Sequence, residues 1–302
     1  MLTQLIEIFF NVITPVFGLV LLGYIAQPRL NLQAQTLSRF AYFLLIPAFV
    51  FNVISTAVVD LSVVSKMVIY ILLVELATAL LAFAVARTLR RPPQMVAAYV
   101  LIAVFANVGN FGLPLIQFRL GETAVLAATI YFLAIMTAGF IIGVAAASWH
   151  KGGTKTAVLA VFKTPALIAI VPAILFNAFH IETPLFASRM INLLAAAMIP
   201  TMLVTLGVQL ASTREIKLTA DTFIATSLRL LGGPLLAILL VIPFGLQGVE
   251  RSAGIIQAAM PAAVLTAIIA MEHDLLPDYV TTAVLLSTIA SVLTLTLILA
   301  FI

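Results

Sequence analysis

Cysteine is absent from the 302 residues, and only 9% of them are charged. The first absence excludes disulfides, thiolate metal sites and cysteine nucleophiles. The second excludes an ordinary soluble domain, in which about 25% of the residues are charged. The formal net charge of +4 is small and its carriers fall between apolar segments, so the composition gives nucleic-acid binding no support. The chain is therefore expected to be an integral membrane protein.

Apolar runs take the place of the missing charges, since 64% of the residues are hydrophobic and the mean hydropathy is +1.24. Each run approaches the ~20 residues that an α-helix needs to cross the hydrocarbon core of a bilayer. The longest connection between runs is Trp149–Thr156, which leaves chemistry little room outside the membrane. We therefore predict an all-α membrane protein with ten transmembrane helices near 4–26, 33–54, 66–88, 94–118, 122–148, 156–178, 184–210, 219–243, 250–272 and 277–301.

Lysine and arginine are distributed unevenly between the two sets of loops. Ten of them follow the odd-numbered segments, and four lie on the other side. By the positive-inside rule, the loops after odd-numbered segments face the cytoplasm. Both ends of the chain are then expected outside the cytoplasm, in a multi-pass protein of the inner (plasma) membrane.

Similar residues recur at nearly constant spacing in the two halves of the chain. The pairs are Pro15 with Pro172, Pro47 with Pro200, and Glu122 with Asp278, at offsets of 157, 153 and 156 residues. Each half holds five predicted helices, and this odd number gives the two copies opposite orientations. That is the inverted-repeat plan of secondary transporters, here with repeats at 1–148 and 156–302. The alternative is coincidence, because proline is common in membrane helices.

Two of the predicted helices carry helix-breaking residues near their middle. They read AVFANVGNFGLPLI at Ala103–Ile116 and IQAAMPAAVLTAII at Ile256–Ile269. A broken helix exposes N–H and C=O groups that lipid cannot satisfy, so it survives only where it lines a cavity or binds something. Interrupted helices at corresponding places in two halves indicate the substrate site of a transporter.

Such breaks are suited to binding an anion. Pro261 lacks an N–H and clashes with the carbonyl one turn back, which breaks or kinks its helix. The N-termini of half-helices offer free N–H donors and positive partial charge, so they can bind an anion without a basic side chain. Asn107 and Asn110 can also donate to a carboxylate. The alternative is that the asparagines only cap the backbone and that Pro261 makes an ordinary kink.

Glu75 and Arg229 are the ionisable residues expected well inside predicted helices. A charge at the bilayer centre is costly and by default marks function. Their near-symmetric places in the two halves make each a candidate partner for the other. Either Glu75 binds a coupling proton, with Arg229 setting its protonation or touching substrate, or the two form a structural ion pair. Weaker candidates are expected to form helix–helix hydrogen bonds (Asn52, Thr205, Gln209, Gln257) or to lie in loops (His150, His180, His273).

Two motifs in this sequence resemble the auxin efflux carrier family. The stretch NVGNFGLPL at Asn107–Leu115 resembles the fourth helix of that family. The stretch from Gln257 (QAAMP) through Glu272, with Leu276-Pro277-Asp278 and Ser287, is similar to its C-terminal region. The similarity covers nearly the whole chain, and the short linker after the fifth helix is typical of a compact, bacterial-type member.

The resemblance implies a scaffold formed by helices at 4–54 and 156–210, and a mobile transport domain formed by helices at 66–148 and 219–301. It implies that the fourth and ninth helices cross at mid-membrane, where organic anions are carried by elevator-type alternating access. Malate or malonate are the substrates expected of a bacterial-type member. A homodimer is implied as well, with protons or sodium as candidate coupling ions.

The sequence departs from the plant carriers at both breaks. Ala106 stands before Asn107 where the plant carriers have proline, and Ala262 follows Pro261 where they have a polar residue. We therefore expect the first break to come from glycines and Asn110, and auxin-like acids to be less suitable substrates than malate or malonate. The predicted substrate site comprises Asn107, Gly109, Asn110, Gly112, Gln257, Pro261 and Ala262.

Other classes of function have less support in the sequence. An enzyme is not expected, because the chain has no cysteine, no HExxH motif, no paired aspartates and no histidine expected at membrane depth. Neither a cofactor nor a metal site is expected. An ion channel and a membrane sensor or receptor with the same fold remain alternatives. A carrier differs from a channel in that it saturates and can be driven uphill by a gradient.

Overall fold

Residues 2–58, 60–148, 165–212 and 218–302 are described by the computed structural model. Within these ranges the chain is helical, and an isolated pairing of Ala106 with Ala262 is the one β-bridge. Seven stretches of the described chain are long and apolar enough to cross a membrane, which confirms an all-α integral membrane protein. They are Ile6–Leu30, Ala34–Ser55, Leu61–Thr88, Glu122–Ala147, Leu185–Ala211, Ala220–Phe244 and Pro277–Phe301.

The three other predicted segments also contain helix. Those near 94–118 and 250–272 are interrupted, so neither contains one long helix. The segment near 156–178 is described from Pro165 onward and is helical from there to Ala178. The connection Trp149–Thr156 and His150 lie outside the described residues. That all ten segments cross the membrane stays a prediction.

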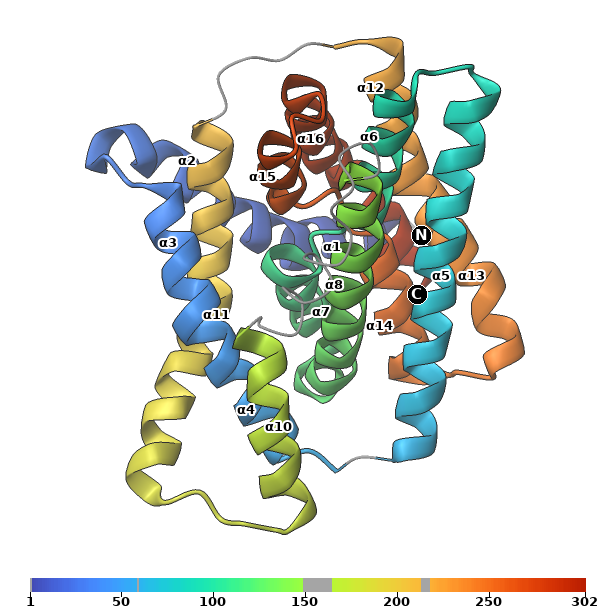
Figure 1. The fold of residues 1–302 in the computed structure, drawn as a ribbon. Helices are drawn as coiled ribbons and strands as arrows, with labels where there is room; N and C mark the ends of the chain where they lie inside the picture. The colour runs from blue at the N-terminus through green and yellow to red at the C-terminus, as the bar shows by residue number, and fades with distance from the viewer. Residues whose placement is uncertain (1, 59, 149–164, 213–217) are drawn as a thin grey trace.

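One group of helices packs together on the left of Figure 1, except for α1 (Leu2–Ile8), which lies in the middle of the view and contacts α16 (Pro277–Phe301). Within it α11 runs along α2 and α4, and α10 packs on α4. Near the end of α10, Asn177 Nδ2 donates to the carbonyls of Ile54, Ser55 and Ala57 at 3.0, 3.2 and 2.7 Å, which satisfies the C-terminal end of α4. The group comprises α1 (Leu2–Ile8), η1 (Phe9–Ile13), α2 (Thr14–Leu30), α3 (Ala34–Phe40), η2 (Ala41–Leu45), α4 (Ile46–Ser55), α10 (Pro165–Ala178) and α11 (Leu185–Ala211).

Two glycines bring α2 and α11 into backbone contact. A Cβ on Gly207 would lie 2.7 Å from the backbone nitrogen of Tyr24, and a Cβ on Gly23 would lie 3.0 Å from the Cα of Val204. Small residues serve this purpose in membranes because lipid provides no hydrophobic force between helices, and close van der Waals contact replaces it. The mutual contact holds the two long helices of this group together.

The remaining helices form a second group around α8. There α6 and α5 pack on α8, α14 packs on α8, and α12 and α15 pack on α16. The group comprises α5 (Leu61–Thr88), α6 (Pro93–Val104), η3 (Val108–Gly112), α7 (Leu113–Leu120), η4 (Glu122–Ala124), α8 (Val125–Ser148), α12 (Ala220–Ser227), η5 (Leu228–Gly232), α13 (Gly233–Phe244), α14 (Gly248–Ala258), α15 (Val264–Glu272) and α16 (Pro277–Phe301).

Proline positions explain the π-helical segments of the described chain. Each of η1, η2, η3 and η5 is followed two residues after its end by a proline, namely Pro15, Pro47, Pro114 and Pro234. A proline ring collides with the carbonyl four residues earlier, and the wider π turn lets the chain pass the ring without ending the helix. Pro172 and Pro200, the predicted counterparts of Pro15 and Pro47, lie inside α10 and α11 without a π-helical segment before them.

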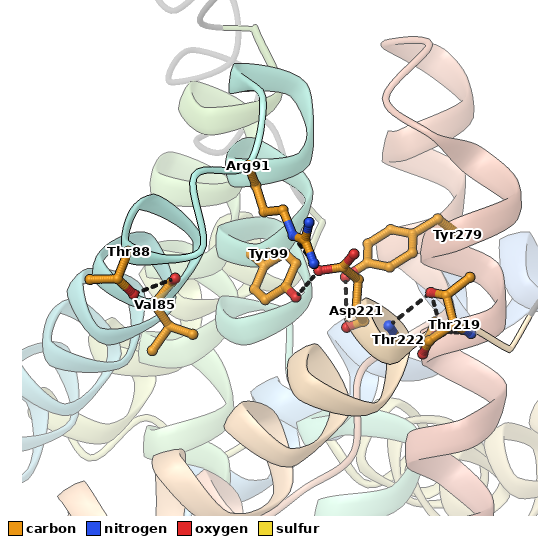
Figure 2. Close-up of polar contacts among 8 residues, drawn as sticks. All are labelled: Val85, Thr88, Arg91, Tyr99, Thr219, Asp221, Thr222 and Tyr279. Carbon is orange, nitrogen blue, oxygen red and sulfur yellow. Dashed lines mark hydrogen bonds and ion pairs between the residues drawn. The ribbon is translucent and has the colours of Figure 1, made fainter.

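Asp221, in the first turn of α12, joins three parts of the second group (Figure 2). Its Oδ1 accepts from Arg91 Nε at 2.9 Å and from the Tyr99 hydroxyl at 2.5 Å. The Tyr279 hydroxyl donates to the Asp221 carbonyl at 3.1 Å, and the two tyrosine rings are stacked. The aspartate therefore connects α6 and α16 at the N-terminus of α12, where negative charge is favourable.

We expect Asp221→Ala to lower the free energy of unfolding by about 1–3 kcal/mol, because the tyrosine hydroxyl and the arginine lose their shared acceptor. Thr88→Ala is the matched control, since that hydroxyl bonds only the carbonyl of Val85 in its own helix, at 2.8 Å. Thermal unfolding of the purified variants in detergent measures the difference. An equal loss in both variants would contradict the role given to Asp221.

Candidate functional site

Two helices of the second group are broken at the places that the sequence predicts. The first stops at Val104 and resumes as η3 at Val108, and the second stops at Ala258 and resumes as α15 at Val264. The two gaps lie against each other and share an antiparallel bridge. Asn107 N donates to the carbonyl of Pro261 at 2.8 Å, and Ala263 N donates to the carbonyl of Phe105 at 2.8 Å. We call this arrangement the crossing.

The bridge satisfies backbone groups that the breaks would otherwise leave bare. A third contact supports it, because Ala262 N donates to the hydroxyl of Ser287 in α16 at 3.1 Å. Ala106 and Ala262, the paired residues, are both buried. Irregular backbone at membrane depth is tolerated only where protein or water forms hydrogen bonds with its N–H and C=O groups. Here each gap provides hydrogen-bond partners for the other.

The first break differs from the expectation that Gly109, Asn110 and Gly112 produce it. These three residues lie within η3, and the helix has already ended at Val104. The glycines instead provide room: a Cβ on Gly109 would lie 2.9 Å from the Phe132 ring, and one on Gly112 would lie 2.9 Å from the carboxamide carbon of Gln257. Without proline at Ala106, the gap is fixed by its hydrogen bonds to the other gap.

Several buried polar atoms at the crossing have no hydrogen-bond partner in the described part of the chain. They are Asn107 Nδ2, Thr266 Oγ1 and Gln257 Oε1. Asn107 is 3% exposed. Thr266 lies in the first turn of α15, where the first backbone N–H groups also lack helical partners. Unpaired buried groups of this kind are uncommon, and donors among them suit a bound anion.

The crossing brings most of the predicted site residues together. Asn107, Pro261 and Ala262 take part in the backbone bridge. Gln257 lies beside Gly112, and its Nε2 donates to the carbonyl of Ala128 in α8 at 3.1 Å. Asn110 is half-buried in η3. That these residues bind substrate stays a prediction.

Sequence reasoning missed Thr266 as a site residue, and it did not anticipate the bond made by Ser287. Thr266 could have been found by its position, since a half-helix that resumes shortly after Pro261 has Thr266 in its first turn, as in α15, which begins at Val264. Ser287 belongs to a helix that has no break. No local signal in the sequence places its hydroxyl against Ala262.

Arg229 binds the C-terminal ends of the two half-helices that precede the breaks, α6 and α14. It lies in η5 and is 1% exposed. Its Nε donates to the carbonyl of Met260 at 3.0 Å, Nη1 donates to the carbonyl of Ala103, and Nη2 donates to the carbonyl of Ala258. These carbonyls lie at or just beyond the C-terminal ends of α6 and α14, where helices carry negative partial charge. One guanidinium thus satisfies both half-helices.

Glu75 and Arg229 do not form a direct ion pair within 4.0 Å, so the structure does not show the structural ion pair that was one of the two alternatives. That Glu75 binds a coupling proton stays a prediction. Glu75, on α5, is 1% exposed, and its Oε2 has no hydrogen-bond partner within the described ranges. The Arg229 guanidinium donates to backbone carbonyls of the crossing and not to Glu75.

The weaker candidates have structural roles. Gln209 Nε2 donates to the hydroxyl of Ser38 in α3 at 2.9 Å, which confirms a helix–helix hydrogen bond. Thr205 instead bonds the carbonyl of Thr201 in its own helix at 2.7 Å. His180 lies just after α10 and His273 just after α15, as expected for residues in loops.

Gly233 allows Arg229 to reach the crossing, and its substitution tests this. A Cβ there would lie 2.8 Å from the carbonyl oxygen of Ala258 and 3.2 Å from Arg229 Nη2. We expect Gly233→Ala to lower the free energy of unfolding by about 1–3 kcal/mol through overpacking. The control is Gly18→Ala in α2, where a Cβ meets nothing within 4 Å. Thermal unfolding in detergent compares them, and an equal response would contradict the close fit.

Comparisons of the sequence with known proteins find similar transporters. The family described as "Membrane transport protein" matches residues 153–299. An "Uncharacterized transporter" of Methanothermobacter thermautotrophicus is 29% identical over 294 residues, covering 93% of this chain and 94% of that protein. A second uncharacterized transporter, from Methanocaldococcus jannaschii, is 24% identical over 301 residues, covering 95% and 96%.

The name of a third relative includes a substrate. It is the "Putative malonate transporter" of Rhizobium meliloti, which is 25% identical over 306 residues, covering 95% of this chain and 93% of that protein. All three similarities extend over nearly the full length of both chains. Residues 153–299 therefore match the membrane transport protein family, and nearly the whole chain is similar to transporters, in keeping with the resemblance of its two helix-break motifs to the auxin efflux carrier family.

Proposed function

We propose that this protein is a secondary active transporter of small organic anions, mono- or dicarboxylates such as malate or malonate, and that it works by elevator-type alternating access. The observation that carries the proposal is the crossing. Two interrupted helices meet through a backbone bridge, and unpaired donors remain beside the second half-helices. Secondary transporters place substrate at such discontinuous helices.

The two sides of the crossing differ in what they can bind. At the C-terminal ends of α6 and α14, which precede the breaks, Arg229 binds the carbonyls of Ala103, Ala258 and Met260. After the breaks, η3 and α15 begin with N–H groups that have no helical partner, and Asn107 Nδ2 and Thr266 Oγ1 lie there unpaired. Helix N-termini with added hydroxyl and amide donors favour a carboxylate. The name of the Rhizobium relative supports the same class of substrate.

The packing supports a division into scaffold and transport domain. We propose that helices at 4–54 and 156–210 form the scaffold and that those at 66–148 and 219–301 move as one body. The side-chain bonds of Asp221 and Arg229 connect elements within the second group. Contacts between the groups are largely apolar, as where Gly109 of η3 faces Met202 of α11. Such a boundary can slide without breaking buried hydrogen bonds.

Two further parts of the proposal concern assembly and coupling. We propose a homodimer formed through the scaffold, since α10 and α11 expose large apolar side chains such as Val171, Phe186 and Leu193. We also propose that Glu75 binds the coupling proton. It is a buried carboxylate of the transport domain, and Arg229 is the charged residue whose field reaches it. Intramembrane carboxylates of this kind are common parts of proton relays.

Uptake into proteoliposomes tests the function. We expect saturable uptake of malate or malonate that an imposed pH gradient drives uphill, because a carrier exposes its site to one side at a time. Glu75→Gln is expected to retain downhill exchange and to lose the response to the pH gradient. Flux that rises linearly with concentration would favour a channel. Absence of flux for every mono- and dicarboxylate, with specific binding of one of them, would favour a sensor.

The crossing is tested by Asn107→Ala, which removes an unpaired buried donor. We expect the apparent KM for the transported anion to rise about tenfold, the effect of losing a hydrogen bond to a charged group. Asn192→Ala is the matched control, since this asparagine is exposed on α11. A KM unchanged by Asn107→Ala would place the site elsewhere.

The orientation is tested by cysteine labelling, which needs no background mutations because the chain has no cysteine. Cysteines at Thr88 and Ser212 should react only from the cytoplasmic side, and those at Glu182 and Gln247 only from outside. All four positions lie near helix ends. Labelling of Thr88 and Gln247 from the same side would contradict the inverted repeat.

A further inference from the structure

Three backbone carbonyls converge on one cation at the crossing. The carbonyls belong to Ala103, Ala258 and Met260, at or just beyond the C-terminal ends of α6 and α14, and the cation is the guanidinium of Arg229. In transporters with broken helices, unwound carbonyls and half-helix C-terminal ends are the groups that coordinate a coupling Na⁺. The side chain therefore lies where such an ion would be expected.

We infer that the Arg229 guanidinium is a resident cation that replaces a coupling metal ion at the crossing, so that transport by this chain needs no sodium. The part of this inference that concerns transport rests on the proposed function. The part that concerns the cation site does not, because the site exists whether or not the chain carries an organic anion.

The surroundings of Arg229 are those of a cation site. A guanidinium has donors in a planar fork, and here three of its nitrogens reach carbonyls of two different helices. Gly233 lacks the Cβ that would block the Ala258 carbonyl. Glu75 is a buried carboxylate of α5 that does not contact the guanidinium, and its Oε2 has no hydrogen-bond partner among the described residues. Converging carbonyl oxygens also form a coordination set for a monovalent metal ion, and a buried carboxylate can balance the charge of that ion.

Charge balance predicts the effect of removing the arginine. A neutral residue at position 229 would leave Glu75 and three carbonyls buried without a positive partner, which is strongly destabilising. A small cation that enters the vacated space would restore the balance. If Arg229 only fastened the helices together, the identity of ions in solution would have no effect on stability. Rescue by added cations therefore separates the two roles.

The first experiment measures the unaltered protein. We expect its thermal unfolding midpoint and its rate of malate or malonate exchange to be the same in sodium as in choline buffers of equal ionic strength. A midpoint or a rate that rises saturably with sodium would overturn the inference, because the resident cation would then not fill the coupling site.

The second experiment vacates the site. In Arg229→Ala, we expect added sodium, lithium or guanidinium ions, the last far below denaturing concentrations, to raise the unfolding midpoint saturably, by about 3 °C once the ion exceeds its Kd tenfold. Choline, which is too large for the space, should have no effect. Arg189→Ala, which removes an exposed arginine of α11, is the matched control and should respond to none of these ions. The double variant Glu75→Gln, Arg229→Ala should lose the response.

Each outcome decides the inference. If none of these ions raises the midpoint of Arg229→Ala above that in choline, the inference is overturned. If Arg229→Ala does not fold in any buffer, Arg229→Lys and Arg229→Met replace it, since they have similar lengths and differ in charge. Folding of the lysine variant alone supports a resident cation, and equal behaviour of the two overturns it.

The readouts also separate this inference from the proposed function. Sodium-dependent uptake of an organic anion would overturn the inference and leave the transporter intact. Ion-rescued stability of Arg229→Ala, with no carboxylate transport by the unaltered protein, would overturn the proposed function and leave the cation site intact.

Discussion

The need to satisfy backbone polar groups among apolar side chains governs this structure. Where α6 and α14 are interrupted, the backbone groups in the gaps have no partners within a helix. The two gaps satisfy each other through hydrogen bonds from Asn107 N to the Pro261 carbonyl and from Ala263 N to the Phe105 carbonyl. The helix ends on the two sides of the breaks differ in their hydrogen bonding. Arg229 satisfies the carbonyls on one side, whereas N–H groups, an amide and a hydroxyl stay unpaired on the other. That imbalance is what suits the crossing to an anion.

Proline has different effects in the long helices and at the crossing. In long helices, a π-helical segment that ends two residues before a proline lets the helix continue past the ring, as at Pro15 and Pro47. At the crossing, Pro261 lies in a true gap and uses its carbonyl as an acceptor. Glycines permit close contact rather than flexibility, whether between α2 and α11 or between η3 and the Gln257 side chain. The same residue types thus favour both tight packing and local unwinding.

Side-chain polar contacts connect the helices within the second group. Asp221 connects its helices at one end, and Arg229 connects them in the interior. Contacts of this group with α11 include an apolar one, between Gly109 and Met202. Buried hydrogen bonds are costly to break, and apolar surfaces exchange partners at lower cost. The distribution is consistent with a rigid body that moves against a less polar partner.

The sequence by itself determined the class, the helical segments and which two segments are broken, because apolar runs and helix-breaking residues act locally on the chain. It also indicated most residues of the crossing, since Asn107 and Pro261 belong to the breaks themselves. Only the tertiary structure decided where the first gap begins, that Thr266 and Ser287 belong to the crossing, and what Arg229 binds. Its partners lie 29, 31 and 126 residues away and are carbonyl groups, which every residue has. A side chain that bonds the backbone leaves no pattern in its partners' residue types, so the sequence could not show that Arg229 binds carbonyls.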